Sequence, residues 1–185
     1  MVPGEGAAML VLESAERAER RGARIYAEAA GYGLSCDAFH MTGGEPSGAG
    51  AVRAMEAALR DAGVATHDVS YISAHGTGTV VNDRLEALAI ARVFGDAARR
   101  IPTSSIKSMI GHAMGAASAI EAAVCALATA EDRIPPTINY ETPDPECDFD
   151  CVPNQARDHR VRVAMNNAYG FGGNNASVVF RKWES

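Results

Sequence analysis

The chain has 185 residues and a formal net charge of −6; 47% of its residues are hydrophobic and 22% are charged. This length suffices for one domain with a proper core, and the composition is ordinary for a soluble globular protein. The negative charge and the lack of a basic stripe with interleaved aromatic residues argue against a nucleic-acid partner.

Neither a membrane span nor a signal peptide is expected. We expect no apolar run of the roughly 18 to 20 residues that a helix needs to cross a bilayer. The first residues, MVPGEGAAMLVLES, lack the basic start of a signal peptide, and Glu5 and Glu13 flank their apolar run. The sequence therefore predicts a cytoplasmic protein with no membrane contact.

The four cysteines do not predict a disulfide framework in a chain of this size. Cys147 and Cys151 form a C-x3-C pair near His159, but no second Cys/His pair follows at zinc spacing. We expect these two residues to be reduced thiols in a loop and expect no metal site there.

The predicted elements alternate roughly between strands and helices. In chain order they are a strand over 6–13, a helix from Ser14 to Gly22, a strand over 24–34, a helix over 48–62, a strand over 69–74, a helix over 82–94 capped by Asn82 or Asp83, a helix over 112–130, and strands over 161–168 and 176–181. This alternation favours α/β layers with strands buried on both faces.

His75 follows the predicted strand 69–74, at the end where open α/β sheets place ligand groups. The glycines beside it permit close backbone approach, and Thr77 and Thr79 offer hydroxyl donors and acceptors. A strand-to-helix turn with a satisfied histidine would show the same pattern, so both interpretations stay open.

His112 opens the predicted helix 112–130. The positive end of a helix dipole disfavours an imidazolium, so a neutral histidine there can donate a hydrogen bond to a developing oxyanion. The alternative is a histidine that only caps the helix.

Lys107 lies in the small polar run TSSIKSMIG, and Glu121 lies on the mostly apolar helix that follows. A carboxylate on such a helix needs a partner if it is buried. Lys107 is therefore either that partner or a solvated loop charge.

The glycine loop GFGGNN, residues 170–175, lies between the last two predicted strands. No Lys-Ser/Thr follows it and its spacing is not G-x-G-x-x-G, so a phosphate loop is not predicted. It is either a tight hairpin turn or a mobile loop whose backbone N–H groups face a substrate carbonyl while Phe171 gates a pocket. With the histidines and threonines, such a loop suits chemistry that forms an enolate or a tetrahedral oxyanion.

Five motifs occur in order and at family spacing: VPGEGAAMLVLE, AHGTGTVVNDRLEA, SSIKSMIGHAMGAASAIEA, PPTIN and NNAYGFGGNNASVVF. Over nearly its whole length the chain resembles the C-terminal part of the β-ketoacyl-acyl carrier protein synthases, the condensing enzymes of fatty acid and polyketide synthesis. The resemblance implies a thiolase-like fold, with two similar halves packed as α-β-α-β-α layers.

The resemblance also implies an activity and roles for particular residues. The family transfers an acyl chain from acyl carrier protein to a cysteine, decarboxylates malonyl-carrier protein and joins the two. By this resemblance, His75 and His112 would stabilise the oxyanion and the enolate, and Lys107 would support the site through Glu121. Thr77 and Thr79 would bind phosphopantetheine, and Gly170, Phe171 and Gly172 would form a gate and an oxyanion hole. Some relatives bind a monovalent cation at the positions of Glu121 and Asn167.

The family's nucleophilic cysteine lies in a T-A-C-S turn, and none of the four cysteines here has that context. The resemblance therefore implies that residues 1–185 form one C-terminal half-domain. We expect a split enzyme in which a partner chain supplies the N-terminal half and the nucleophile, assembled as a dimer of heterodimers. No bound cofactor is expected beyond the phosphopantetheine carried by the acyl carrier protein.

Three alternatives remain. The chain is a non-catalytic partner like the chain-length factors, an inactive truncated product, or a small module that binds acyl carrier protein. Retention of His75, Lys107, His112 and the GFGG loop argues against a purely structural subunit.

Overall fold

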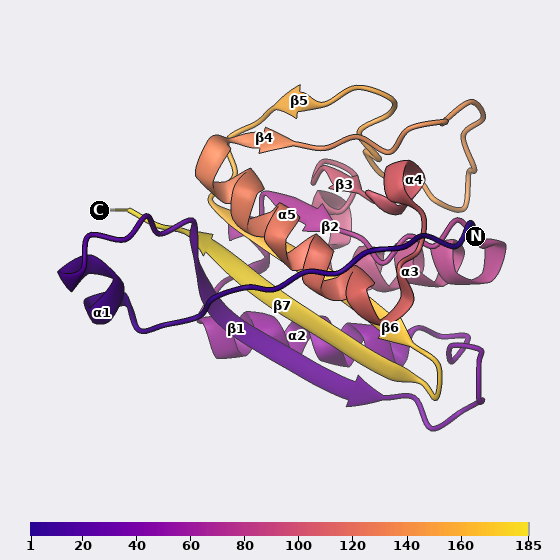
Figure 1. The fold of residues 1–185 in the computed structure, drawn as a ribbon. Coiled ribbons are helices and arrows are strands. Elements are labelled where there is room, and N and C mark those ends of the chain that lie inside the picture. Colours follow the sequence, from indigo (N-terminus) through magenta and orange to yellow (C-terminus); the bar gives the residue numbers. More distant parts are fainter. Residues whose placement is uncertain (185) are drawn as a thin grey trace.

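The computed structural model of the chain describes residues 1–184 (Figure 1). Its helices and strands are α1 (Ala15–Arg20), β1 (Ala27–Cys36), α2 (Ala49–Ala62), β2 (Tyr71–Ser73), α3 (Val80–Phe94), β3 (Thr103–Ser104), α4 (Lys107–Ile110), α5 (Ala117–Glu131), β4 (Arg133–Ile134), β5 (Arg157–Asp158), β6 (Val163–Gly170) and β7 (Asn174–Lys182), with single 3-10 turns at Thr66–Asp68, Gly95–Ala97 and Met114–Ala116.

Five strands form one mixed sheet in the order β1-β7-β6-β2-β3. Strand β2 runs parallel to β3 and β6, whereas β7 runs antiparallel to β6 and β1. Strands β6 and β7 form the hairpin expected across the glycine loop, and its last pair is Gly170 with Asn174. Because β2 and β3 are parallel, the residues that follow them emerge at the same edge of the sheet.

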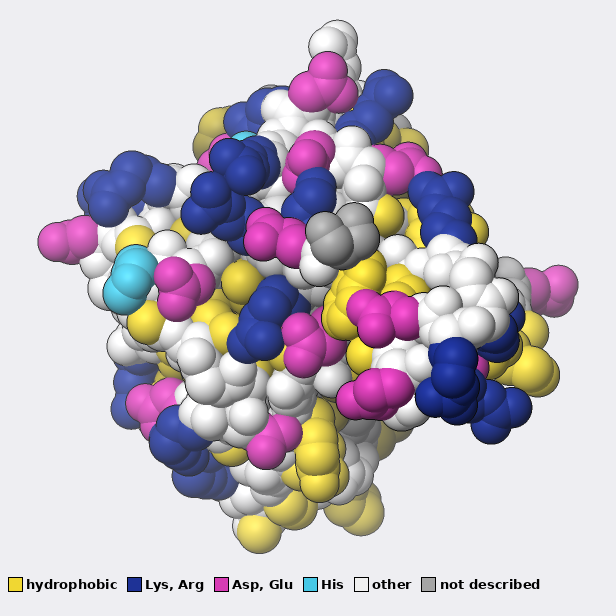
Figure 2. Space-filling model, turned by 90° about the vertical axis from the view of Figure 1, so that its left-hand side faces the viewer, with side chains coloured by type: hydrophobic (Ala, Val, Ile, Leu, Met, Phe, Trp, Pro, Cys, Tyr) yellow, Lys and Arg dark blue, Asp and Glu magenta, His cyan; other side chains and the backbone are white. Residues whose placement is uncertain are grey.

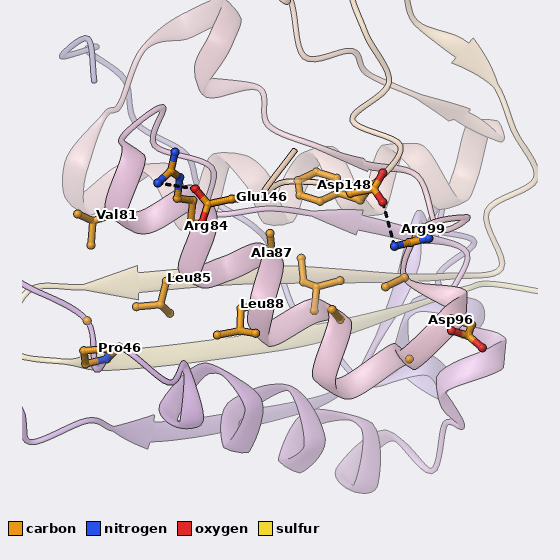
Figure 3. Close-up of a pocket in the computed structure, with 16 residues that line it drawn as sticks. Pro46, Val81, Arg84, Leu85, Ala87, Leu88, Asp96, Arg99, Glu146 and Asp148 are labelled. Carbon is orange, nitrogen blue, oxygen red and sulfur yellow. Dashed lines mark ion pairs between the residues drawn. The ribbon is translucent and has the colours of Figure 1, made fainter. Parts of the chain in front are cut away.

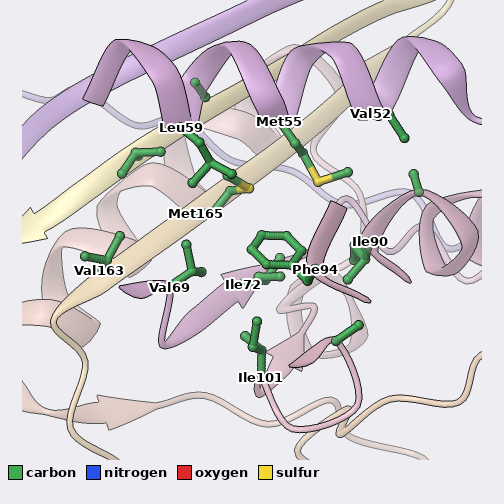
Figure 4. Packing of buried hydrophobic residues seen from close by; sticks show 14 of the residues in the cluster. Val52, Met55, Leu59, Val69, Ile72, Ile90, Phe94, Ile101, Val163 and Met165 are labelled. Carbon is green, nitrogen blue, oxygen red and sulfur yellow. The ribbon is translucent and has the colours of Figure 1, made fainter. Parts of the chain in front are cut away.

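Helices cover both faces of the sheet, which confirms the predicted α/β class. Helices α2 and α3 pack on one face, where Met55, Leu59 and Ile72 belong to the main core cluster (Figure 4). Helix α5 covers the other face, where Tyr71 and Cys125 belong to a second cluster. Tyr71 and Ile72 are both fully buried because neighbouring strand residues point to opposite faces.

Helix α2 follows its apolar pattern closely. Val52, Met55, Ala58 and Leu59 are all buried, as their spacing on one helix face predicts. The helix ends at Gly63, whose φ of +61° is the left-handed conformation that glycine adopts without a steric penalty.

The strand predicted over residues 6–13 is not formed. This segment is extended but pairs with no strand, and its side chains at Met9, Val11 and Leu12 are largely exposed. Figure 1 shows the indigo segment crossing the outer side of α5 instead of joining the sheet. Its apolar composition therefore reflects an uncovered surface and not a sheet position.

Two helices begin elsewhere than predicted. Helix α3 begins at Val80 with Thr79 as its N-cap residue, so neither Asn82 nor Asp83 caps it. Helix α5 begins only at Ala117, after a 3-10 turn, so His112 does not open it.

One segment of residues 1–184, Met114–Glu131, is long and apolar enough to span a membrane by length and composition alone. The expectation that no segment reaches this length was therefore wrong. In the structure this segment consists of a 3-10 turn and α5, and α5 lies across the sheet with the buried carboxylate of Glu121 on its inner face. Its inner face packs on the sheet, but only 28% of the segment is buried.

Candidate active site

His75 and His112 meet at the carboxyl edge of the sheet. His75 follows β2, is 7% exposed, and has its ring centroid 5.5 Å from that of His112 in an edge-to-face arrangement. Tyr169 of β6 packs on His75 as well, with ring centroids 5.4 Å apart. The structure thus brings together two histidines that lie 37 residues apart in the sequence.

The carboxylate of Glu86 holds the backbone of the turn that carries His75. It accepts the N–H groups of His75 and Gly76, each at 2.9 Å, from the buried side of α3. Burial raises the pKa of Glu86 to about 7, against the opposing effect of the two backbone hydrogen bonds. Glu86 was missed in the sequence, although a glutamate on the buried face of a helix is a recognisable signal for such a role.

His112 is held by the backbone of the N-terminal segment. Its N–H donates to the carbonyl of Val2 at 2.8 Å, and its carbonyl accepts the N–H of Gly4 at 3.0 Å. The N–H of Met114 donates to the ring Nδ1 of His112 at 3.1 Å, so Nδ1 is the acceptor and Nε2 carries the proton in the neutral ring.

Both histidines are kept neutral by their surroundings. Burial, the Lys107 charge and His112 lower the pKa of His75 to about 3. Burial and the Lys107 charge also lower the pKa of His112. The neutrality expected for His112 is thus supported, but its causes are burial and Lys107 and not a helix dipole, because His112 precedes α5 by five residues.

The predicted pairing of Lys107 with Glu121 is confirmed. Nζ of Lys107, in α4, is hydrogen-bonded to Oε1 of Glu121, in α5, and both side chains are buried. Burial raises the pKa of Glu121, and the Lys107 charge opposes that shift. The pair joins the helix after β3 to the helix that covers the sheet, directly beside the two histidines.

Two cavities meet at His112. One, of about 780 Å³, is lined by Thr77, Thr79, Lys107 and His112, and the two threonine hydroxyls lie 2.8 Å apart. The other, of about 330 Å³, is lined by His75, His112 and residues of the β6–β7 hairpin. A molecule in either cavity can therefore reach the His112 ring.

The glycine loop is a tight hairpin turn in this structure. Gly172 and Gly173 have φ values of +84° and +79°, and the Phe171 side chain is 73% exposed. The N–H of Gly172 donates to the carbonyl of Met41 at 2.7 Å, and the N–H of Asp37 donates to the carbonyl of Gly173 at 2.8 Å. The segment after β1 thus fastens the loop, and a gating motion of Phe171 would have to break these bonds.

Asn167 does not face Glu121. Its Oδ1 accepts the hydroxyl of Ser177 at 2.8 Å, and its Nδ2 lies 3.5 Å from the sulfur of Met55, on the α2 side of the sheet. The neighbouring Asn166 points to the α5 side, where its Nδ2 donates to the carbonyl of Ser118. The Asn167 side chain and the Glu121 carboxylate therefore lie on opposite faces of the sheet, because neighbouring strand residues point to opposite faces. A cation beside Glu121 stays a prediction.

Residues 1–184 contain no cluster of three or more His, Cys, Asp or Glu side chains suited to a metal ion. The Oε2 of Glu121 and the Oδ1 of Asn166 are buried without a hydrogen-bond partner within that part of the chain.

Removal of one member of the Lys107–Glu121 pair should destabilise the protein more than removal of both. Lys107→Met leaves Glu121 buried without its partner, and we expect the free energy of unfolding to fall by about 3 kcal/mol. The double variant Lys107→Met/Glu121→Leu should recover most of this loss. Denaturant unfolding measures the free energies. A double variant that loses as much stability as Lys107→Met alone, or as much as the two single variants together, would contradict a coupled buried pair.

The pH dependence of the free energy of unfolding should show that His75 is neutral in the folded protein. Below pH 6.5 the unfolded chain binds a proton at His75 that the folded chain, with a pKa of about 3, does not bind. The free energy of unfolding therefore falls as the pH falls, by about 2 kcal/mol at pH 5 for this group alone. His75→Asn should reduce the loss between pH 7.5 and pH 5 by that amount, and an unchanged loss would mean that His75 titrates normally.

Comparison with known proteins identifies the family. Residues 26–141 match the family described as "Beta-ketoacyl synthase, C-terminal domain". The 3-oxoacyl-(acyl-carrier-protein) synthase 2 of Staphylococcus aureus (strain COL) is 52% identical over 184 residues, which cover 100% of this chain and 44% of the relative. The 3-oxoacyl-(acyl-carrier-protein) synthase 2 of a Synechocystis species is 50% identical over 183 residues, which cover 99% of this chain and 44% of the relative. The chain thus spans under half the length of these relatives.

Solved structures agree with this assignment. The structure titled "The ishigamide ketosynthase/chain length factor" superposes with a TM-score of 0.94 at 51% identity, covering 98% of this chain and 44% of that chain. The structure of a type II polyketide acyl-carrier protein in complex with its ketosynthase has a TM-score of 0.91 at 44% identity, covering 93% of this chain and 42% of that chain. The chain belongs to the β-ketoacyl synthase family and corresponds to its C-terminal domain.

Proposed function

We propose that this chain is the C-terminal half of a β-ketoacyl-acyl carrier protein synthase that acts in fatty acid or polyketide synthesis. It would serve the condensation of malonyl-carrier protein with an acyl thioester held on a partner's cysteine. The observation that carries the proposal is the pair of neutral, edge-to-face rings of His75 and His112 beside the Lys107 ammonium.

Neutral histidines suit the step in which charge develops on oxygen. Loss of CO2 from a malonyl thioester leaves its electron pair as an enolate, whose oxygen needs hydrogen-bond donors. Nε2–H of His112 is such a donor, and His75 is placed to provide a second. The enolate carbon then attacks the acyl thioester, a C–C bond forms and the partner's thiolate leaves.

The second oxyanion would be bound at the glycine loop. The N–H of Gly172 is already committed to Met41, so Phe171 is the better donor from this loop. Gly170 and Gly172 would then shape the turn so that the Phe171 N–H stays available to the oxyanion. The carrier's phosphopantetheine arm would lie in the 780 Å³ cavity against Thr77 and Thr79.

The nucleophile is proposed to come from a complementary N-terminal half. Cys125 is fully buried, and burial raises its pKa far above the ordinary value. Cys147 and Cys151 line the 780 Å³ cavity, which we call the carrier cavity. Burial raises the pKa of both thiols, to about 11 for Cys147, so neither is readily deprotonated to the thiolate. Cys36 lines neither cavity at the histidines.

Exposed apolar side chains support a large partner surface. The N-terminal segment and α5 lie on the same side of the sheet (Figure 1). Their side chains at Met9, Val11, Leu12 and Leu127 are exposed. The end of the molecule that carries α1 instead mixes Lys and Arg with Asp and Glu, as a solvated surface does (Figure 2). We place the complementary half on a partner chain, in a cytoplasmic dimer of heterodimers. One similar structure is a ketosynthase in complex with its chain length factor.

Histidine variants of the complex purified from the native host test this proposal. His75→Ala and His112→Ala should each lower kcat for condensation by about 10²-fold to 10³-fold, because each removes an oxyanion donor. Assembly should be unchanged, and His67→Ala, at an exposed position, serves as the matched control. Full activity of both variants in an intact complex would indicate a binding or chain-length subunit. Recovery of the chain without a partner would contradict the split arrangement.

A further inference from the structure

The connector between β4 and β5, residues 135–156, forms a wall shared by two cavities. On one side it lines the 780 Å³ cavity that holds Thr77, Thr79 and His112. On the other side it lines an open cavity of about 890 Å³ against the outer surface of α3. The connector residues in the first wall include Ile138, Tyr140, Asp144, Cys147 and Cys151.

The connector is strongly acidic and is fastened by arginines. Its acidic residues over ten positions are Glu141, Asp144, Glu146, Asp148 and Asp150. Arg99 lies 3.1 Å from Asp148 and Arg157 lies 2.5 Å from Asp150. Without such cations the carboxylates would repel one another and the backbone would spread.

Arg84 differs from the other two arginines because it contacts two connector carboxylates. Its Nε lies 3.4 Å from Asp144, and its guanidinium lies 2.5 Å from Glu146. Figure 3 shows Arg84 of α3 reaching across to Glu146, and Arg99 to Asp148. Arg84 is thus the link between α3 and the part of the connector nearest the carrier cavity.

The two carboxylates belong to an ordered turn. Oδ1 of Asp144 accepts the N–H of Glu146 at 2.9 Å, and the Asp144 carbonyl accepts the N–H of Cys147 at 2.9 Å. Asp144 and Cys147 line the carrier cavity, and Thr79, the N-cap residue of α3, lines it as well. A movement of this turn away from α3 would therefore widen the cavity.

We propose that Arg84 is a positioning residue, which clamps the acidic connector against α3 and so sets the width of the cavity for the carrier's thioester-bearing arm. The identity of that occupant rests on the proposed function. Exposed ion pairs often contribute little to global stability. The clamp therefore acts on the local opening of the connector, which a global unfolding measurement does not resolve.

Arg84→Ala in the purified complex tests the clamp in two ways. Amide hydrogen exchange should accelerate in the connector, at the Glu146 and Cys147 amides above all, and stay unchanged in β6 and β7. The Kd for phosphopantetheine-loaded carrier protein and the KM for malonyl-carrier protein should rise about threefold to fivefold, with a smaller change in kcat. Arg84→Lys should restore most of the affinity. Arg60→Ala, which removes an exposed ion pair with Glu56 on α2, is the matched control.

The outcomes separate this inference from the proposed function. Unchanged exchange in the connector of Arg84→Ala would overturn the clamp. Faster exchange with unchanged carrier Kd would overturn its role in binding. A wild-type complex that fails to condense its substrates would contradict the proposed function, whereas exchange and Kd would still decide the role of Arg84.

Discussion

The buried pair of Lys107 and Glu121 is the interaction on which the site depends. It fixes α4, which follows β3, against α5, which covers the sheet. His112 lies in the short link between these two helices, so the pair limits where its ring can stand. Burial, and then the Lys107 charge, lower the pKa of both histidines. One buried cation thus positions one ring and helps to keep two rings neutral.

The second constraint is the parallel pairing of β2 with β3 and β6. It brings His75, which lies two residues after β2, to the same edge as the helix that carries Lys107. Glu86 then holds the His75 backbone from α3, while Tyr169 of β6 packs against the ring. The site is therefore assembled from the ends of separate elements, as open α/β sheets assemble ligand sites.

Several features were predictable because they depend on local pattern. The strand before His75, the helix with Met55 and Leu59 on one face, and the β6–β7 hairpin follow from hydrophobic periodicity and glycine. The partner of Glu121 was predictable because a carboxylate on an apolar helix needs one.

The features that the sequence did not predict depend on tertiary context. The segment over 6–13 has strand-like composition but no neighbouring strand to pair with, so its backbone stays extended and uncovered. The face taken by Asn167 depends on strand register, in which one residue reverses the direction of every side chain. The contact of Tyr169 with His75 joins residues 94 positions apart, and no local pattern reports it.

We propose that this chain stabilises developing negative charge, whereas a partner supplies the covalent step. The most direct measurement is CO2 release from malonyl-carrier protein by a complex whose partner's nucleophilic cysteine is replaced by alanine. We expect decarboxylation to continue in that complex and to be lost when His112 of this chain is also replaced by alanine. Decarboxylation that is insensitive to His112 would contradict this proposal.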